Sequence, residues 1–334
     1  MKVVHGFDQL PPAFHGAAYA VGNFDGLHLG HRAVIDQAKD IARDRGVPCG
    51  VITFEPHPRH YFSPNDPPFR LTPLSRKAAI LEDWGVDCMV AVPFDAALAN
   101  TSAESFVADG LVGGLRVGHL IVGHDFAFGH KRGGNTAFLT ERATTFGFGV
   151  TIVEAHLAPS GALYSSRAIR ELLQSGRPGD AAESLGRWWA IDGTVQHGDA
   201  RGRDLGFPTA NLELGAYLQP SLGIYAVRAA VDHGGGTNWY DGAANLGLRP
   251  TFDGRTVLLE VHLLDFAGDL YGKRMDVALI EYLRPEERFA DIDSLIVQMR
   301  TDCANARQIL ALPGYATGRF DATTPPHTRD EPLP

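Results

Sequence analysis

Two histidines three residues apart carry the strongest chemical signal in the chain. His28 and His31 close the segment GNFDGLHLGH, residues 22–31, which follows the apolar run 17–21 and precedes a helical pattern over 31–45. This order predicts a strand, a glycine-containing turn and a helix whose N-terminal N–H groups can face an anion. Two imidazoles on one side of the first turn can stabilise charge that develops on a polyphosphate. Helix-capping histidines beside a tight turn are the alternative.

A loop later in the N-terminal half combines flexibility, positive charge and aromatic rings. The segment GHDFAFGHKRGGN, residues 123–135, contains four glycines, which let backbone approach a ligand closely. Its cations can neutralise phosphate, and a phenylalanine can cover a flat ring. The residues that suit these two roles are Lys131, Arg132, Phe126 and Phe128. A solvated basic turn is the alternative.

A cationic glycine loop and a short oxygen-rich element stand together at residues 193–212, GTVQHGDARGRDLGFPTANL. Glycines recur at every fourth position with arginines between them, so this loop can wrap phosphates with its N–H groups. Those residues are Gly198, Gly202, Gly206, Arg201 and Arg203. On an extended segment Thr209 and Asn211 face one side, and their oxygens suit a hard cation such as Mg²⁺. A turn followed by an edge strand would explain PTAN alone.

A carboxylate interrupts an apolar strand pattern in TVLLEVHLLDF, residues 256–266. Alternation along a strand places Glu260 and His262 on the same face as two leucines, Leu258 and Leu264. A carboxylate in a strand usually faces solvent, so a surface residue is the alternative to a catalytic one.

These segments resemble a known family. GNFDGLHLGH is similar to the HxGH nucleotidyltransferases, and more closely to the adenylyltransferase half of the bacterial bifunctional riboflavin kinase/FAD synthetases. Residues 193–212 resemble the riboflavin kinase signature, and the resemblance spans about residues 15–312. It implies two reactions that use ATP. Riboflavin would be phosphorylated to FMN, and FMN would be adenylylated to FAD with release of pyrophosphate.

The resemblance also implies roles for residues whose chemistry the sequence alone leaves open. Glu260 would be the base of the kinase reaction, His28 and His31 the charge-stabilising pair of the adenylyl transfer, and Thr209 with Asn211 the Mg²⁺ ligands. ATP would contact Gly22, Phe24, Asp25, Gly26, His28, His31, Ser165, Ser166, Arg170, Gly198, Arg201 and Gly202. The flavin would contact His57, Asp125, Phe126, Phe128, Arg132, Arg249 and Arg284.

The chain departs from the family pattern at one position. In YSSRAIR, residues 164–170, Arg167 stands where the family has Ser or Thr. A third hydroxyl contact to the triphosphate is therefore missing. Either this arginine has taken over part of that contact, or it is a solvated charge on the helix.

Length and composition agree with a two-domain protein of a reducing compartment. The chain has 334 residues and a formal net charge of −9, which argues against a nucleic-acid or anionic-membrane partner. Its three cysteines are odd in number and lack metal-binding spacing, so they are expected to be buried thiols. The N-terminus has no apolar signal-peptide core, and no long apolar run follows. We therefore expect a cytoplasmic location. The oligomeric state is left open.

The pattern of the chain changes near residue 187. Before it, apolar runs alternate with helical patterns, which predicts a doubly wound, mostly parallel α/β sheet in a nucleotidyltransferase domain, 1–187. Beyond it, short strands between Gly, Pro, Asp and Asn predict a small antiparallel barrel with a terminal helix, 188–312, as the kinase domain. A partly helical linker is expected at 175–187 and a disordered tail at 313–334.

Individual elements follow from the same patterns. Four runs, 49–54, 88–92, 120–122 and 150–153, are expected as strands buried on both faces. The expected helices of the first domain are 31–45, 73–84, 102–112, 134–146 and 166–174. The expected barrel strands are 190–196, 225–231, 241–246, 257–265 and 276–283, and the terminal helix is 288–312. A nucleotidyltransferase for another substrate and a flavin carrier with vestigial catalytic residues are the functional alternatives.

Overall fold

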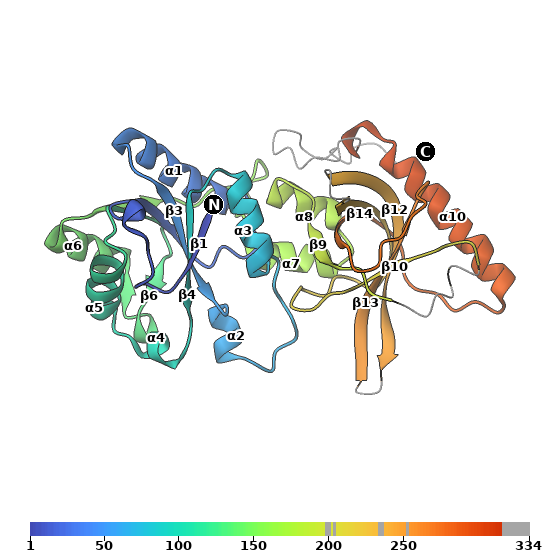
Figure 1. Ribbon diagram of the computed structural model, residues 1–334, viewed down its shortest axis with the longest axis horizontal. Coiled ribbons are helices and arrows are strands. Elements are labelled where there is room, and N and C mark those ends of the chain that lie inside the picture. The colour runs from blue at the N-terminus through green and yellow to red at the C-terminus, as the bar shows by residue number, and fades with distance from the viewer. Residues whose placement is uncertain (198–201, 203–204, 233–236, 252–253, 316–334) are drawn as a thin grey trace. The chain divides into compact units, whose positions relative to one another are not determined.

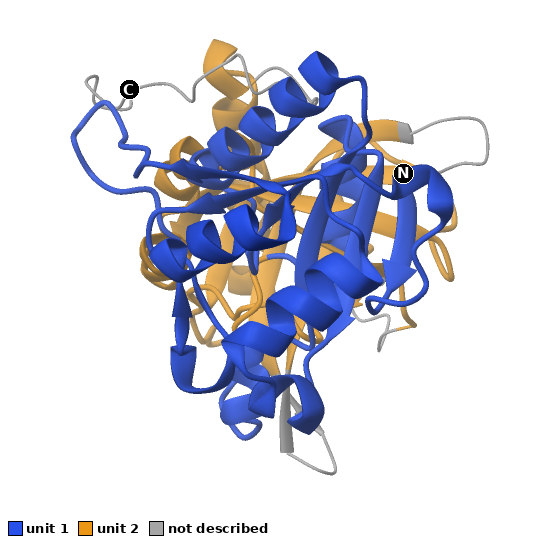
Figure 2. Cartoon of the chain, turned by 90° about the vertical axis from the view of Figure 1, so that its left-hand side faces the viewer, with its two compact units in different colours: residues 1–67, 72–165 blue, residues 68–71, 166–334 orange. Residues whose placement is uncertain are grey.

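The computed structural model divides the chain into two compact units. One consists of Met1–Pro67 and Thr72–Ser165, the other of Pro68–Leu71 and Ser166–Pro334 (Figure 2). The structure describes residues 1–197, 202, 205–232, 237–251 and 254–315. Among them, no helix is long and apolar enough to cross a membrane.

The first unit is built on six parallel strands in the order β1-β4-β3-β2-β5-β8 (Figure 1). Their bounds are β1 Lys2–His5, β2 Ala18–Val21, β3 Cys49–Glu55, β4 Cys88–Pro93, β5 His119–Gly123 and β8 Gly149–Val153. The strand order runs one way from β2 to β4 and resumes on the other side of β2 with β5. The carboxyl end of β2 is therefore a topological switch point, where open α/β sheets bind ligands.

Helices cover both faces of this sheet, as the predicted doubly wound fold requires. On one face, α1 (Leu29–Arg45) and α3 (Leu74–Asp83) pack on apolar side chains of β2, β3 and β4. On the other face lie α6 (Thr136–Phe146) and the π-helical segment η2 (Phe106–Gly114), which continues α5 (Ala103–Ser105). Short elements in the loops complete the unit: η1 Pro12–Phe14, α2 Pro58–Phe62, α4 Ala96–Asn100, β6 Ala127–Phe128, η3 His130–Arg132 and β7 Gly134–Asn135.

Two strands of the sheet correct the expectations. Lys2–His5 pairs with β4 as an edge strand, although its single buried residue, Val4, gave no recognisable apolar run. The strand β8 is not buried on both faces, because it is the opposite edge strand and its Ile152 is 40% exposed. An edge strand needs less apolar surface than a central one, so its sequence pattern is weaker.

The second unit contains an antiparallel six-stranded sheet in the order β10-β13-β12-β11-β14-β9. The bounds are β9 Ala190–Thr194, β10 Ala210–Glu213, β11 Gly223–Asp232, β12 Thr237–Thr251, β13 Gly254–Leu263 and β14 Arg274–Arg284. The Gln196 N–H donates to the Asn211 carbonyl at 2.9 Å, which nearly closes the sheet into the predicted barrel. The four-residue β10 is absent from the expected barrel strands, although an edge strand after a turn was the alternative interpretation of PTAN.

Helices that precede the barrel strands in the sequence, and one that follows them, pack against the barrel. The helices α7 (Ser166–Gln174) and α8 (Pro178–Leu185) insert Ile169, Leu173 and Leu185 into the barrel's core. By packing, residues 166–187 thus go with the barrel, whereas the predicted boundary assigned them to the first domain. The expected linker, 175–187, is mostly the helix α8.

The terminal helix α10 (Ile292–Leu310) lies against the outside of the barrel through Cys303, Ala306 and Leu310. The predicted helix, 288–312, begins too early, since α10 starts at Ile292, whose side chain is still 62% exposed. The first residues of the expected tail, η4 (Pro313–Tyr315), are ordered on the barrel, where the Tyr315 ring lies 5.4 Å from that of Trp188. The rest of the expected tail, 316–334, lies outside the described residues.

Candidate functional site

The two histidines of the first unit lie together at the start of α1, beyond the carboxyl end of β2. His28 is the N-cap, and its Nδ1 accepts a hydrogen bond from the His31 N–H at 3.2 Å. The two rings are stacked, with centroids 3.6 Å apart and planes 18° apart. Because Nδ1 of His28 is an acceptor, the proton of its neutral imidazole resides on Nε2. The first turn of α1 carries no acidic residue, which leaves its N-terminus favourable to an anion.

The turn before α1 is held by a segment distant in sequence. Asp25 is 2% exposed, and its Oδ1 accepts a hydrogen bond from the Thr72 N–H at 3.0 Å. The Gly26 N–H in turn donates to the Thr72 hydroxyl at 2.9 Å. The backbone is left-handed at Phe24, Gly26 and Leu27, with φ of 47°, 91° and 45°, so two side chains occupy a region that normally favours glycine. These buried contacts stabilise the conformation, and the predicted ATP contacts of the turn stay predictions.

A buried lysine completes this support, and the sequence patterns did not single it out. Lys77 on α3 is fully buried, and its Nζ donates to the Asn23 carbonyl at 2.6 Å and to Thr53 Oγ1 at 2.8 Å. Thr53 on β3 donates to the same carbonyl at 3.1 Å. Burying an ammonium costs several kcal/mol unless it is well bonded, so a lysine here is unexpected in a purely structural helix. The signal was its position on the apolar stripe of α3, with Leu74 and Leu81.

The predicted flavin-binding residues of the first unit lie in its loops. His57 caps α2, where its Nδ1 accepts the Arg59 N–H at 3.1 Å. Asp125 is exposed at the turn after β5, and Arg132 is exposed in η3 with a left-handed φ of 58°. Each therefore has a surface position compatible with binding, and the roles stay predictions.

The two phenylalanines of the same loop differ in what they can contact. Phe126 and Phe128 stack with centroids 5.3 Å apart. Phe128 is 7% exposed and packs in the core beside Phe106, whereas Phe126 is only partly buried. Of the two, Phe126 is therefore the ring with a surface to offer a flat ligand.

The serine and arginine residues at the start of α7 fall at the boundary of the two units. Ser165 ends the first unit, and Ser166 opens α7 in the second. Arg170 donates through Nε to the Phe69 carbonyl at 2.9 Å, which attaches residues 68–71 to α7. Arg167 is different, since its side chain is 89% exposed and pairs with Glu171 at 2.8 Å, which raises its pKa. This pairing favours a solvated helix charge at position 167.

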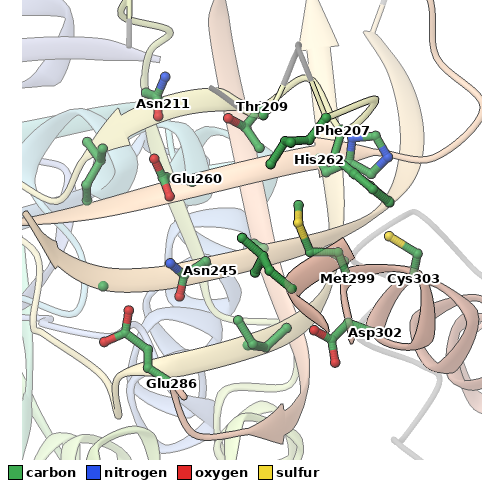
Figure 3. Close-up of a pocket in the computed structure, with 18 of the residues that line it drawn as sticks. Phe207, Thr209, Asn211, Asn245, Glu260, His262, Glu286, Met299, Asp302 and Cys303 are labelled. Carbon is green, nitrogen blue, oxygen red and sulfur yellow. The ribbon is translucent and has the colours of Figure 1, made fainter. Parts of the chain in front are cut away.

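The barrel contains a cavity of about 570 Å³, lined by residues of β10, β13 and β12, by the segment after β14 and by the helix α10. Glu260 on β13 lies in register with Asn211 on β10 and with Asn245 on β12. All three side chains line the cavity (Figure 3), so the carboxylate stands between two amides. Position 260 is therefore not a plain surface position. Asn245 had not been predicted to carry chemistry, although it lies four residues before Arg249, a predicted flavin contact.

The predicted Mg²⁺ ligands fit a hard cation. Thr209 and Asn211 line the same cavity two residues apart, and the Asn211 side-chain oxygen is buried with no hydrogen-bond partner in the described structure. An amide oxygen without a partner beside a hydroxyl is a donor set that magnesium accepts. His262 stabilises this segment, because its Nδ1 lies 2.9 Å from the Pro208 carbonyl. No cluster of three His, Cys, Asp or Glu residues that can hold a metal occurs among the residues described.

Other predicted residues of the kinase site have mixed outcomes. Gly202 lines the cavity, and its carbonyl accepts the Phe207 N–H at 2.7 Å. Gly198 and Arg201 lie outside the described residues, as does the side chain of Arg249. Arg284 lines the cavity but forms a bidentate pair with Asp302 of α10, at 2.9 and 2.7 Å, which raises the arginine's pKa. This pair fastens α10 to the barrel, and a flavin contact by Arg284 stays a prediction.

Comparisons with known proteins match both halves of the chain. The family model described as FAD synthetase matches residues 10–167, and that described as riboflavin kinase matches residues 185–310. The bifunctional riboflavin kinase/FMN adenylyltransferase of Escherichia coli K12 is 40% identical over 313 residues, covering 93% of this chain and 99% of its own. That of Pseudomonas fluorescens is 41% identical over 313 residues, covering 93% of this chain and 98% of its own.

A solved structure agrees with the fold of both units. A crystal structure described as a macrolide-efflux protein from Streptococcus pneumoniae is 27% identical, with a TM-score of 0.80 over 92% of this chain and 99% of that one. Together with the two curated relatives and the two family models, this similarity extends over nearly the whole chain. The chain belongs to the bifunctional riboflavin kinase/FMN adenylyltransferase family.

Proposed function

We propose that this protein phosphorylates riboflavin to FMN in the barrel and adenylylates FMN to FAD at the turn before α1. ATP is the second substrate of both reactions. The observation that carries the proposal is the presence, in one chain of this family, of two separate constellations. These are the stacked pair His28 and His31 at a helix N-terminus and the row of Asn211, Glu260 and Asn245 in the barrel cavity.

In the kinase reaction an alcohol must lose its proton. Glu260 is the base that takes the proton from the terminal ribityl hydroxyl as that oxygen bonds to the γ-phosphorus of ATP. The bond from that phosphorus to the bridging oxygen breaks, and ADP leaves. The barrel's contribution is a fixed carboxylate on a central strand, which keeps the base and the hydroxyl in line.

The same cavity is suited to Mg²⁺. Thr209 and Asn211 are the residues that would hold it, and the buried, unpartnered oxygen of Asn211 supports this assignment. A bound Mg²⁺ supplies charge neutralisation to the phosphates of ATP. The chain itself contributes two neutral oxygen ligands, one on β10 and one on the residue just before this strand.

In the adenylyl transfer no base is needed, because the attacking group is already a phosphate anion. An oxygen of the FMN phosphate bonds to the α-phosphorus of ATP, and pyrophosphate leaves. His28 and His31 donate hydrogen bonds to the phosphate oxygens on which charge accumulates, beside the N–H groups of the first turn of α1. The contacts of Thr72 and Lys77 keep this turn in place without reorganisation.

Location and partners follow from charge and thiol chemistry. Cys49 and Cys88 are buried in the first unit, and burial raises their pKa values to about 12 and about 11. Such thiols resist both oxidation and alkylation at neutral pH. The net charge of −9 supports our proposal that the protein is a cytoplasmic enzyme of small-molecule substrates that binds neither nucleic acid nor membranes.

The direct test is incubation of the purified protein with riboflavin, ATP and Mg²⁺, followed by chromatography of the flavins. We expect FMN to appear first and FAD to follow, and no product in excess chelator. A protein that binds flavins without turnover under these conditions would be a carrier. Formation of FAD from supplied FMN alone would reduce the proposal to its adenylyl half.

A further inference from the structure

The row of three polar residues in the barrel contains one that no step above uses. Asn245 lies opposite Glu260 in the pairing of β12 with β13, on the side away from Asn211. The flanking cavity positions of β12 are Ala243 and Gly247, and a carboxylate oxygen of Glu286 lies over Gly247, so the amide stands beside a second carboxylate of the cavity wall. A polar side chain between two small residues, on the wall of a cavity, is a place where a ligand can bond.

The amide of Asn245 is not satisfied by its surroundings. Its side-chain oxygen is buried and has no hydrogen-bond partner in the described structure, as is true of Asn211. A buried amide oxygen left without a donor typically costs about 1–3 kcal/mol. Because an amide rotated about its Cβ–Cγ bond can present either its N–H or its oxygen, Asn245 can bond a group that both donates and accepts. A hydroxyl is such a group.

Position along the sheet separates this amide from the predicted metal ligands. Facing residues on adjacent antiparallel strands have Cα atoms about 4.5–5.5 Å apart, so Asn211 and Asn245 are about 10 Å apart with Glu260 between them. Because Glu260 lies between the two amides, Asn245 would have to reach past this carboxylate to share a Mg²⁺ held by Asn211. Thr209 shares the side of Asn211 and not that of Asn245. The second amide therefore faces the substrate that the base deprotonates.

We propose that Asn245 is a substrate-positioning residue of the kinase site, whose amide bonds a non-reacting hydroxyl of the polyol chain and thereby holds the terminal hydroxyl at Glu260. This inference rests on the kinase function proposed above. It assigns to the barrel a means of recognising a hydroxylated side chain. A flat ring system with an unhydroxylated chain would leave this buried amide unpaired.

The test measures coupling between this side chain and single hydroxyls of the substrate. Wild type, Asn245→Ala and a control, Asn238→Ala, are assayed with riboflavin and with three analogues, each lacking the 2′, 3′ or 4′ hydroxyl. Asn238 lies on the same strand but is exposed, and its odd spacing from position 245 puts it on the other face. Wild-type turnover of riboflavin is the first measurement, since its absence would refute the kinase function rather than the role of Asn245.

We expect kcat/KM for riboflavin to fall about tenfold in Asn245→Ala, which corresponds to one lost hydrogen bond, and to stay unchanged in the control. With the wild-type protein, kcat/KM for one of the three analogues should be about tenfold lower than for riboflavin. With Asn245→Ala, the same analogue should show no further decrease relative to riboflavin. Fully multiplicative losses with all three analogues would overturn the proposal.

A second measurement excludes a metal-binding role without relying on turnover. Mn²⁺ is titrated into each variant in the presence of ADP, and free Mn²⁺ is followed by electron paramagnetic resonance. We expect an unchanged affinity in Asn245→Ala and a weakened one in Asn211→Ala, which serves as the positive control. Equal weakening in both variants would make Asn245 a metal ligand and would overturn the assignment to the polyol.

Discussion

The two sites of this protein are constructed in different ways. At the turn before α1, the imidazoles of His28 and His31 lie beside backbone N–H groups of the first helical turn, and the side chains that hold this conformation come from Thr53, Thr72 and Lys77, which are distant in sequence. In the barrel, the chemistry lies in side chains that the strand register sets in a row. The site at the turn therefore depends in part on distant residues that do not touch a substrate. The barrel site depends on the few side chains that the strand pairing sets in this row.

This difference predicts different responses to mutation. In the barrel, substitution of a residue in the row should lower the kinase activity severely, whereas substitution of a residue on the other face of the same strands should leave it unchanged. At the turn, substitution of the supporting residues should also lower the adenylyl-transfer activity. The reason is that a conformation with left-handed φ at Phe24 and Leu27 needs stabilisation by other parts of the chain.

The largest effect is expected at the centre of the row. Glu260→Gln should lower FMN formation from riboflavin about 10²–10⁴-fold, since the amide cannot accept the proton. Adenylylation of supplied FMN should be unchanged. The measurement is flavin chromatography with each substrate, and Glu213→Gln, at the exposed end of β10, is the control. Loss of both activities by a folded Glu260→Gln protein would contradict the separation of the sites.

The histidine pair should give the opposite outcome. In His28→Ala with His31→Ala, adenylyl transfer should fall about 10²–10³-fold, because donors to the developing charge are removed. Riboflavin should still be phosphorylated, so FMN accumulates. His15→Ala, just before β2 at its amino end, is the control. Unchanged FAD synthesis in the double variant would assign the histidines to capping alone.

An intermediate effect is expected at the buried lysine, which tests the dependence of the turn on its support. Lys77→Met should lower kcat/KM for adenylyl transfer about 10–100-fold, the size expected for lost hydrogen bonds from a charged donor. The kinase activity should stay within about twofold of wild type.

Lys39→Met on α1 is the matched control for this variant, because that lysine is partly exposed and pairs with Asp36 at 3.5 Å. Both proteins are assayed well below their melting transitions. A lowered melting temperature with unchanged adenylyl kinetics would show that Lys77 stabilises the unit without positioning the turn.

The smallest effect is expected at Arg167. Because its side chain is exposed and paired with Glu171, Arg167→Ala should leave the ATP dependence of FAD formation within about twofold of wild type. Arg167→Thr, which restores the usual family residue, is the companion variant. A tenfold rise in the KM for ATP in the alanine variant alone would mean that the arginine contacts the triphosphate.

The sequence predicted what is local and missed what is brought together from afar. The strand, turn and helix around His28, the placement of His28 and His31 on one side of the first turn and the parallel sheet all follow from glycine placement and apolar period. The support from Thr72 and Lys77 does not, because the position of Lys77 on an apolar stripe does not reveal which distant groups its ammonium bonds. The register of Asn245 with Glu260 likewise depends on which strands pair, and the short strand β10 was hidden within a loop-like segment.

Packing also explains the remaining differences. Edge strands such as β1 and β8 need little apolar surface, so their sequence patterns are weak guides. The pattern of β1 did not indicate a strand, and that of β8 indicated more burial than the structure has. The helix α7 matches the expected helix 166–174 closely, yet only the contacts of Ile169 and Leu173 with the barrel core reveal with which unit it packs.

The central claim is that two independent sites act in sequence, and mixing two defective variants tests it most directly. Glu260→Gln and the double variant His28→Ala with His31→Ala are each incubated with riboflavin, ATP and Mg²⁺, alone and at equal concentrations together. The flavins are then separated over time. We predict riboflavin alone from the first protein, FMN alone from the second, and FAD from the mixture, because FMN released by one active barrel can reach the intact turn of the other chain. A mixture of folded variants that yields no FAD, while each retains its single expected activity, would contradict two sites linked by free FMN.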